Sequence, residues 1–160
     1  MKQLFLSKYF WIAAAAAVVS FGPIYKRLPV RIDGTLDRSL PYHLWITYSD
    51  FNDTLHRYAV FVPPVHNRYT RHVRYLVKEI GCLPGQRLVV SGRDCYCDGR
   101  YLGRALERGS DGRRLEQFEY NGTVPAGEYF MVGTHPHSYD SRYFGLVKRS
   151  SIVRGARPIW

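Results

Sequence analysis

Residues 75–85, which read YLVKEIGCLPG, form the segment that decides the fold. Their aliphatic side chains give the segment the character of a short strand in a protein core, and Pro84-Gly85 supplies the turn that ends it. Lys78 interrupts this apolar run with an ammonium group. Strand alternation alone would place Lys78 on the solvent face, so an inward-facing Lys78 would indicate a chemical role.

Similar short runs of aliphatic, aromatic and β-branched residues recur along the rest of the chain. The predicted strands are Leu44–Tyr48, Tyr58–Val62, Arg74–Ile80, Arg87–Val90 and Tyr129–Val132. Turn signals separate them, at Pro63-Pro64, Pro84-Gly85, Asp98-Gly99, Asn121-Gly122 and Ala126-Gly127. The chain has 160 residues, which is enough for one domain with a core. The pattern predicts a mainly β fold in which the polar segment 103–120 is an exposed insertion.

The N-terminal part of the chain has a different composition. No charged residue occurs from Tyr9 to Tyr25, and basic residues flank this apolar run on both sides. Such a run fits a short membrane-spanning helix or the apolar part of a secretory signal. We predict that residues 1–27 form an apolar helix that acts as a membrane anchor, with a signal segment as the alternative. Either assignment sends residues 28–160 across the membrane.

The chain is strongly basic, with a formal net charge of +10 from 23 Lys and Arg against 13 Asp and Glu. Such a surplus suits a nucleic acid or the anionic face of a membrane. The basic residues between Arg68 and Arg74 and between Arg100 and Arg114 are interrupted and match no nucleic-acid-binding motif. We therefore expect a solvated basic surface and no specific nucleic-acid partner.

The cysteines and histidines do not predict a metal site. Cys95-Tyr96-Cys97 is too tight for the usual ligand spacing, and His135-Pro136-His137 has no third ligand at a supportive distance along the chain. If Cys95 and Cys97 share a strand they also share a face, where they do not bridge easily. A disulfide from Cys82 to either of them in an oxidising compartment and three reduced thiols both remain open.

The residue types suited to catalysis are a serine and a lysine. Serine alone is a poor nucleophile and needs a base within hydrogen-bonding reach. A buried lysine can be that base, because burial disfavours the ammonium form and leaves a neutral amine that accepts a proton. Lys78 has the apolar neighbours that this requires, and Ser39 lies in DRSLP at residues 37–41, just after the apolar N-terminal segment.

A series of segments in fixed order resembles the type I signal peptidases. RSLP at 38–41 is followed by YAVFVPP at 58–64, YLVKEIGCLPG at 75–85, VPAGEYFMVG at 124–133 and SYDSRYFGLV at 138–147. The resemblance implies a mostly antiparallel β fold whose second lobe is reduced to about residues 91–123. The Ser-Leu-Pro stretch and the compact length look most like the conjugative-transfer branch, the TraF-type enzymes that mature pilin subunits.

The resemblance also assigns roles to individual residues. It makes Ser39 the nucleophile, Lys78 its base, Ser138 the hydroxyl that holds the lysine amine, and Asp140 and Arg142 a structural ion pair with Ser141 beside it. The backbone N–H of Ser39 would contribute to the oxyanion hole. The chain departs from the family pattern in three places. Leu40-Pro41 follows the nucleophile, and the stretch 134–137 is shorter than in the family. Asp37 is a hydrogen-bond acceptor at the position where some relatives have a hydroxyl donor to the oxyanion.

The function implied by the resemblance is a membrane-anchored serine endopeptidase that needs no cofactor. The enzyme would be anchored in the bacterial inner membrane, with its catalytic domain in the periplasm. Its substrate would be an exported precursor polypeptide, in particular a conjugative pilin subunit. It would mature this pilin, and some relatives also cyclise theirs. The alternatives are a general signal peptidase for secretory precursors and a catalytically silent, membrane-tethered scaffold of a secretion or conjugation machine. A self-cleaving repressor of related fold is disfavoured by the N-terminal apolar segment.

Overall fold

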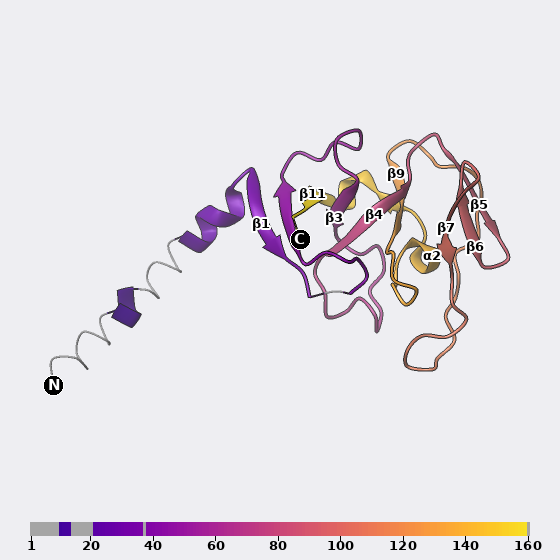
Figure 1. Cartoon of the computed structure of the whole chain (residues 1–160), viewed down its shortest axis with the longest axis horizontal. Coiled ribbons are helices and arrows are strands. Elements are labelled where there is room, and N and C mark those ends of the chain that lie inside the picture. Colours follow the sequence, from indigo (N-terminus) through magenta and orange to yellow (C-terminus); the bar gives the residue numbers. More distant parts are fainter. Residues whose placement is uncertain (1–9, 14–20, 37, 160) are drawn as a thin grey trace.

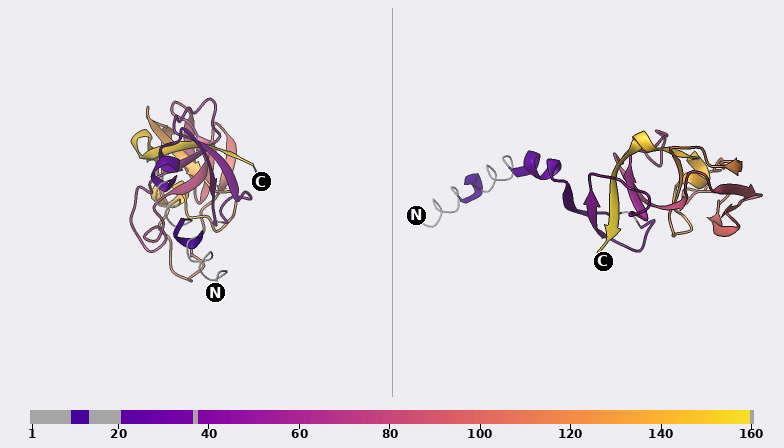
Figure 2. Two further views of the ribbon diagram at one scale, coloured as in Figure 1. Left: turned by 90° about the vertical axis from the view of Figure 1, so that its left-hand side faces the viewer. Right: turned by 90° about the horizontal axis from the view of Figure 1, so that it is seen from above.

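The computed structural model describes residues 10–13, 21–36 and 38–159, and its core is built from two antiparallel sheets (Figure 1). Residues 10–13 and 21–27 are helical. Figures 1 and 2 show them projecting from the end of the molecule where the first strand lies. Among the described residues, no helix is both long and apolar enough to cross a bilayer. The apolar run at 14–20 lies outside the described residues, so the anchor assigned to residues 1–27 stays a prediction.

The larger sheet has seven strands in the order β1-β2-β11-β3-β4-β9-β10. Its strands are β1 (Val30–Gly34), β2 (Leu44–Tyr48), β3 (Tyr58–Phe61), β4 (Leu76–Cys82), β9 (Glu128–Val132), β10 (Val147–Lys148) and β11 (Ile152–Pro158). All neighbouring pairs are antiparallel. A short helix, α2 (Ser141–Phe144), and a 3-10 turn, η1 (Arg149–Ser151), complete this part of the chain.

The smaller sheet has four strands and forms the second lobe. Its order is β7-β6-β5-β8, with β5 (Arg87–Ser91), β6 (Asp94–Cys97), β7 (Arg100–Arg104) and β8 (Asn121–Thr123). It therefore begins at Arg87, a few residues before the expected lobe of 91–123. Asn121-Gly122, which we expected in a turn, pairs with β5 instead. The predicted mainly antiparallel β fold with a small second lobe and a helix in the N-terminal part is confirmed.

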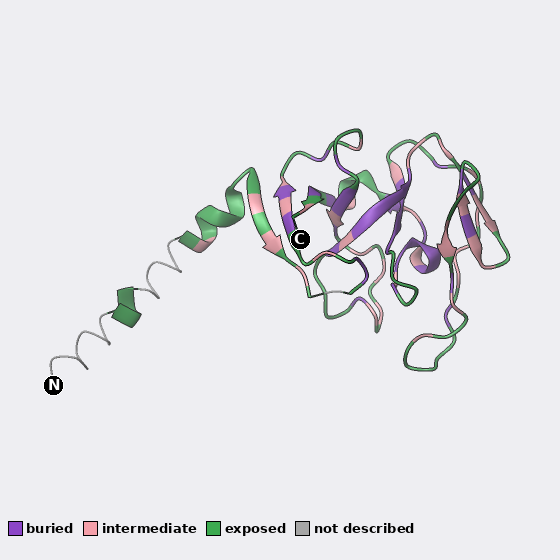
Figure 3. Cartoon of the chain, in the orientation of Figure 1, coloured by how far each residue is buried: buried purple, intermediate pink, exposed green. Residues whose placement is uncertain are grey.

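Strand β4 is buried along most of its length because both faces of the sheet are covered (Figure 3). Leu76 and Ile80 belong to one apolar cluster, Val77 packs against a second, and Cys82 belongs to a third. A strand covered on both faces has no solvent side for a charged residue. Lys78 in the middle of β4 is accordingly 1% exposed, which excludes the solvent-facing position that strand alternation suggested.

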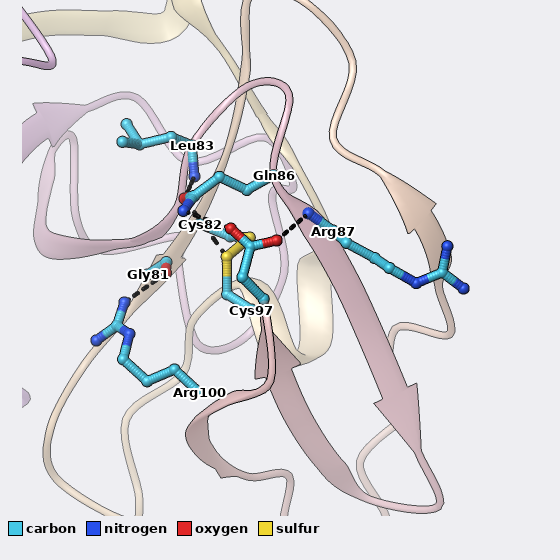
Figure 4. The surroundings of a disulfide bond; sticks show 8 residues. Gly81, Cys82, Leu83, Gln86, Arg87, Cys97 and Arg100 are labelled. Atoms are coloured by element: carbon cyan, nitrogen blue, oxygen red, sulfur yellow. Dashed lines mark hydrogen bonds between the residues drawn. A yellow bond between two sulfur atoms is a disulfide. The ribbon is translucent and has the colours of Figure 1, made fainter.

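The two sheets are joined by a disulfide between Cys82 at the end of β4 and Cys97 on β6 (Figure 4). Next to it, the Arg100 guanidinium donates a hydrogen bond to the carbonyl of Gly81 at 2.9 Å. Cys95 lies on the same strand as Cys97 but is reduced and buried, and desolvation raises the pKa of its thiol to about 11. Of the pairings that the sequence left open, the structure contains the one from Cys82 to Cys97.

Candidate active site

Ser39 lies in the loop that connects β1 to β2. The loop is closed at its base by a hydrogen bond from the Thr35 N–H to the His43 carbonyl at 2.9 Å. Leu40, the residue after the serine, is 4% exposed and packs in a cluster with Trp45 and Tyr58. Because Leu40 is anchored in this way, its neighbour Ser39 is held at the cleft and is itself only 4% exposed. The Leu-Pro sequence therefore has a packing role at this turn.

Lys78 reaches Ser39 from the centre of the larger sheet. On β3 its register partner is Ala59, a small residue with no exposed surface. Nζ of Lys78 donates a hydrogen bond to Oγ of Ser39, across a sequence separation of 39 residues. The predicted serine and lysine are thus in direct contact in the fold, in a setting where both side chains are almost fully removed from water.

The segment that follows β9 closes the other side of this pair. Gly133 has no Cβ, and one built there would meet Cβ of Ser138 at 2.6 Å and the carbonyl oxygen of Ser39 at 2.8 Å. The His135 N–H donates to that same Ser39 carbonyl at 3.1 Å. A glycine at 133 is therefore what allows the serine loop and Ser138 to approach so closely.

Ser138 is 4% exposed, and its hydroxyl makes no hydrogen bond to any described residue. The expected hydrogen bond between Ser138 and Lys78 is consequently not formed in this geometry, although both residues line the same cleft. A buried hydroxyl without a partner is rare and destabilising, and it tends to mark a place where a ligand, a water or a moving side chain completes the contact.

Asp140 and Arg142 form a buried ion pair behind the cleft. The Arg142 guanidinium donates to both carboxylate oxygens of Asp140, at 2.7 and 2.8 Å, and the side chains are 0% and 3% exposed. Desolvation lowers the pKa of Arg142, but its hydrogen bond and charge attraction to Asp140 outweigh this, so that the pKa is raised overall. Asp140 also accepts from the Gly133 N–H at 2.8 Å, which ties the pair to the residue beside Ser138.

Ser141 connects the same segment to the sheet. Its hydroxyl accepts a hydrogen bond from the Met131 N–H of β9 at 2.8 Å, and Arg142 also donates to the Arg104 carbonyl of β7 at 3.1 Å. The three predicted support residues therefore join the segment after β9 to both sheets. Their effect is to fix the backbone of residues 133–140 around the serine and lysine.

The site opens into a cleft with a volume of about 730 Å³. Besides Ser39, Lys78 and Ser138, its walls include Tyr69, Tyr75 and Tyr139. The rings of Tyr69 and Tyr139 stack with centroids 4.7 Å apart, and both pack against a buried cluster of Ala105, Leu115 and Tyr143. The walls combine apolar and aromatic side chains with the polar side chains of Arg38, Thr70, His135 and His137.

These aromatic wall residues were not singled out from the sequence. Tyr139 stands inside the quoted segment SYDSRYFGLV, but Tyr69 lies in a basic, irregular stretch with no periodic signal. His135 and His137 are exposed at the cleft, and within the described part of the chain no three residues of metal-binding type gather. Asp37, the departure noted at the expected oxyanion hole, lies outside the described residues.

The molecule is thus an antiparallel β protein in which a buried serine and a buried lysine are in contact at a cleft. The family model described as signal peptidase, peptidase S26, matches residues 4–160. The chain belongs to this signal peptidase family.

Individual relatives agree with the family. The conjugal transfer protein TraF of Agrobacterium tumefaciens (strain 15955) is 35% identical over 86 residues, covering 53% of this chain and 48% of that protein. Signal peptidase I V of Bacillus subtilis (strain 168) is 28% identical over 113 residues, covering 62% and 63%. The match thus spans about half the length of the TraF protein.

Among solved structures, a signal peptidase I from Enterococcus faecalis V583 is 27% identical, with a TM-score of 0.37, covering 59% of this chain and 88% of that one. The predicted resemblance to the type I signal peptidases, with a TraF-like character, is therefore confirmed by the family and its relatives.

Proposed function

We propose that the protein is an endopeptidase in which Ser39 is the nucleophile and Lys78 the general base. The observation that carries this proposal is the hydrogen bond between Lys78 Nζ and Ser39 Oγ at the floor of the cleft, with the side chains 1% and 4% exposed. Taking an ammonium out of water disfavours its charged form. A lysine held in this way is suited to accept a proton rather than to serve as a surface charge.

The reaction would proceed in two steps through an ester. Ser39 Oγ attacks the scissile carbonyl carbon while its proton passes to Lys78 Nζ, and the tetrahedral oxyanion collapses with release of the new amino terminus, which takes the proton from Lys78. Water then attacks the Ser39 ester while Lys78 accepts a proton from it, and the ester bond breaks as Lys78 returns that proton to Ser39 Oγ and the carboxyl-terminal end of the other product is released. The Ser39 backbone N–H is our candidate donor to the oxyanion.

The remaining predicted residues have supporting roles in this proposal. Ser138, whose buried hydroxyl has no hydrogen bond to a described residue, would hold the lysine amine once Ser39 has been acylated. Asp140, Ser141 and Arg142 keep the backbone of residues 133–140 against the serine loop. These three do not touch the reacting atoms and are positioning residues.

The test is precursor cleavage by purified variants. Ser39→Ala and Lys78→Ala should each abolish cleavage while the protein still folds, because nucleophile and base act as a unit. A penem that acylates active-site serines should label the wild type and not Ser39→Ala. Lys148→Ala, at an exposed lysine on β10, is the matched control and should keep full activity. Full activity of either site variant would refute the proposal, and a wild-type protein that neither cleaves precursors nor is labelled would favour a silent scaffold.

We propose an exported precursor as substrate, and a conjugative pilin subunit in particular. The support for the pilin is the higher identity to the conjugal transfer protein TraF, 35%, than to signal peptidase I V, 28%. The ester could be opened by water or by the pilin's own amino terminus, and which occurs depends on whether that amine is held nearby. Mass spectrometry of the product decides: a mass lower by one water than that of the linear product means cyclisation. Cleavage of ordinary secretory precursors but not of pilin would favour a general signal peptidase.

The proposed location is the inner membrane, with residues 28–160 in the periplasm and residues 1–27 as anchor. The Cys82–Cys97 disulfide supports an oxidising compartment, since such bonds are rare in the cytosol. The basic chain also suits anionic lipid. Protease added to spheroplasts should digest the domain, and protection of the domain there would contradict this topology.

A further inference from the structure

A buried arginine holds the point where the N-terminal helix enters the β fold. Arg154, on β11, is 7% exposed and donates to the carbonyls of Leu28 at 3.1 Å and Pro29 at 2.8 Å, just before β1 begins. The same guanidinium donates to the side chain and the carbonyl of Thr47 on β2, at 3.0 and 3.1 Å. One side chain thus joins the entry segment to two strands of the sheet.

The partners of this arginine are unusual for a buried cation. Arg154 forms no ion pair with any described residue, and all its hydrogen bonds go to neutral oxygens. Desolvation, followed by the nearby charge of Arg31, lowers its pKa. The nearby charge of Asp33, which accepts a hydrogen bond from the Thr47 hydroxyl, opposes this shift. Burying a cation with no carboxylate of a described residue in direct contact is nevertheless costly. This arginine donates hydrogen bonds to the carbonyls of residues 28 and 29, which an apolar residue at this position could not do.

A second contact fixes the helix from the outside. The Tyr25 hydroxyl donates to the Ile32 carbonyl at 2.5 Å and accepts from the Ile32 N–H at 3.2 Å, on β1. β1 is an edge strand, so these backbone groups have no other strand to pair with on that side. The helix end is therefore bound to β1 itself rather than joined to it by a free linker.

The clamped strand leads directly to the nucleophile. β1 ends at Gly34 and runs into the loop that carries Ser39, while Thr47 of β2 donates a hydrogen bond to Asp33 of β1. The direction of the helix is thereby fixed relative to the cleft through β1, β2 and β11. Figure 2 shows the helix leaving the molecule at the β1 end.

We propose that Arg154 is a positioning residue, which with Tyr25 couples the N-terminal segment rigidly to the β fold and so sets the orientation of the cleft relative to the membrane. This inference rests on the proposed peptidase function and on the proposed anchor. If the cleft has one fixed orientation relative to the membrane, Ser39 meets the scissile bond of a membrane-bound precursor at one fixed distance from the bilayer. A loose joint spreads the encounter over many unproductive orientations.

The coupling is tested first without any reference to activity. Spin labels at Gly22→Cys on the helix and at Ser150→Cys on the exposed 3-10 turn, in the full-length protein, report the spread of distances by dipolar spectroscopy. The wild-type background should give a narrow distribution, and Arg154→Met and Tyr25→Phe should each broaden it. Arg157→Met, an exposed arginine on the same strand that donates to the Leu55 carbonyl, is the matched control and should not. Narrow distance distributions in both Arg154→Met and Tyr25→Phe would overturn the coupling.

The positioning role is tested by comparing two substrates. Against a precursor in membrane vesicles, kcat/KM of Arg154→Met and Tyr25→Phe should fall by roughly 10- to 100-fold, the scale of a misplaced reacting group. Against a soluble peptide spanning the cleavage site, both should match the wild type. An equal loss on both substrates would overturn the positioning role. If Arg154→Met does not fold, Tyr25→Phe decides the question, since Tyr25 is 42% exposed. Wild-type protein that cuts neither substrate refutes the peptidase function, while the distance measurement still decides the coupling.

Discussion

Gly133→Ala is the smallest change that should disable the site. The added methyl group would meet Ser138 Cβ at 2.6 Å and the Ser39 carbonyl oxygen at 2.8 Å, both closer than a Cβ is normally found to other heavy atoms. Neither neighbour is the tip of a flexible chain, so the serine loop and the segment after β9 must separate. Overpacking of this kind costs about 1–3 kcal/mol of folding stability. Because the displaced residues are Ser39 and Ser138 of the proposed site, we expect a large loss of activity and only a modest loss of folding stability.

The assay pairs thermal unfolding with cleavage of a fluorogenic peptide. Gly122→Ala on β8 is the matched control, because a Cβ there meets only the Tyr120 ring at 3.6 Å, an ordinary contact. It should unfold and cleave like the wild type. A Gly133→Ala protein with wild-type turnover and melting temperature would refute the reasoning that close backbone approach builds this site.

Three further perturbations follow from the buried groups. Arg142→Met should destabilise the protein by about 3–5 kcal/mol, because it leaves the Asp140 carboxylate buried without its cation, and the double variant with Asp140→Asn should lose less. Replacing Cys82 and Cys97 by serine should lower the free energy of unfolding by about 3 kcal/mol, since the bond closes a loop with a sequence separation of 15. Desolvation lowers the pKa of His56, so the stability held by its neutral ring should be present above about pH 6.5 and lost as the pH falls below it.

Denaturant unfolding measures all three effects. A double variant at 140 and 142 that is less stable than Arg142→Met would contradict the buried-charge account. An unchanged midpoint after reduction of the disulfide would contradict the loop-closure estimate. For His56, the comparison is His56→Gln, which should lose less stability between neutral and mildly acidic pH. A variant with the same acid sensitivity as the wild type would show that another group is responsible.

The sequence by itself determined the class of fold, and it predicted the serine and the lysine that we propose as nucleophile and base. β2 matches its predicted bounds, Leu44–Tyr48, and the other predicted strands differ from the structure by one or two residues at their ends, because short apolar runs bounded by turn residues are a local signal. Ser39 and Lys78 were identified from ordered segments of sequence. The order of segments along the chain can be recognised without knowing which strands pair in the fold.

What only the tertiary structure decided depends on contacts between distant parts of the chain. β11 was not predicted, since IVRGARP has no alternation, yet it lies inside the sheet between β2 and β3. The choice of Cys97 over Cys95 as the partner of Cys82 follows from the way β6 faces β4 across the two sheets. In the sequence, Arg154 is one of many basic residues, and only the structure shows that it is buried and donates hydrogen bonds to the carbonyls of Leu28 and Pro29. Burial and non-local hydrogen bonding arise only when strands far apart in sequence pack together, and no local pattern encodes them.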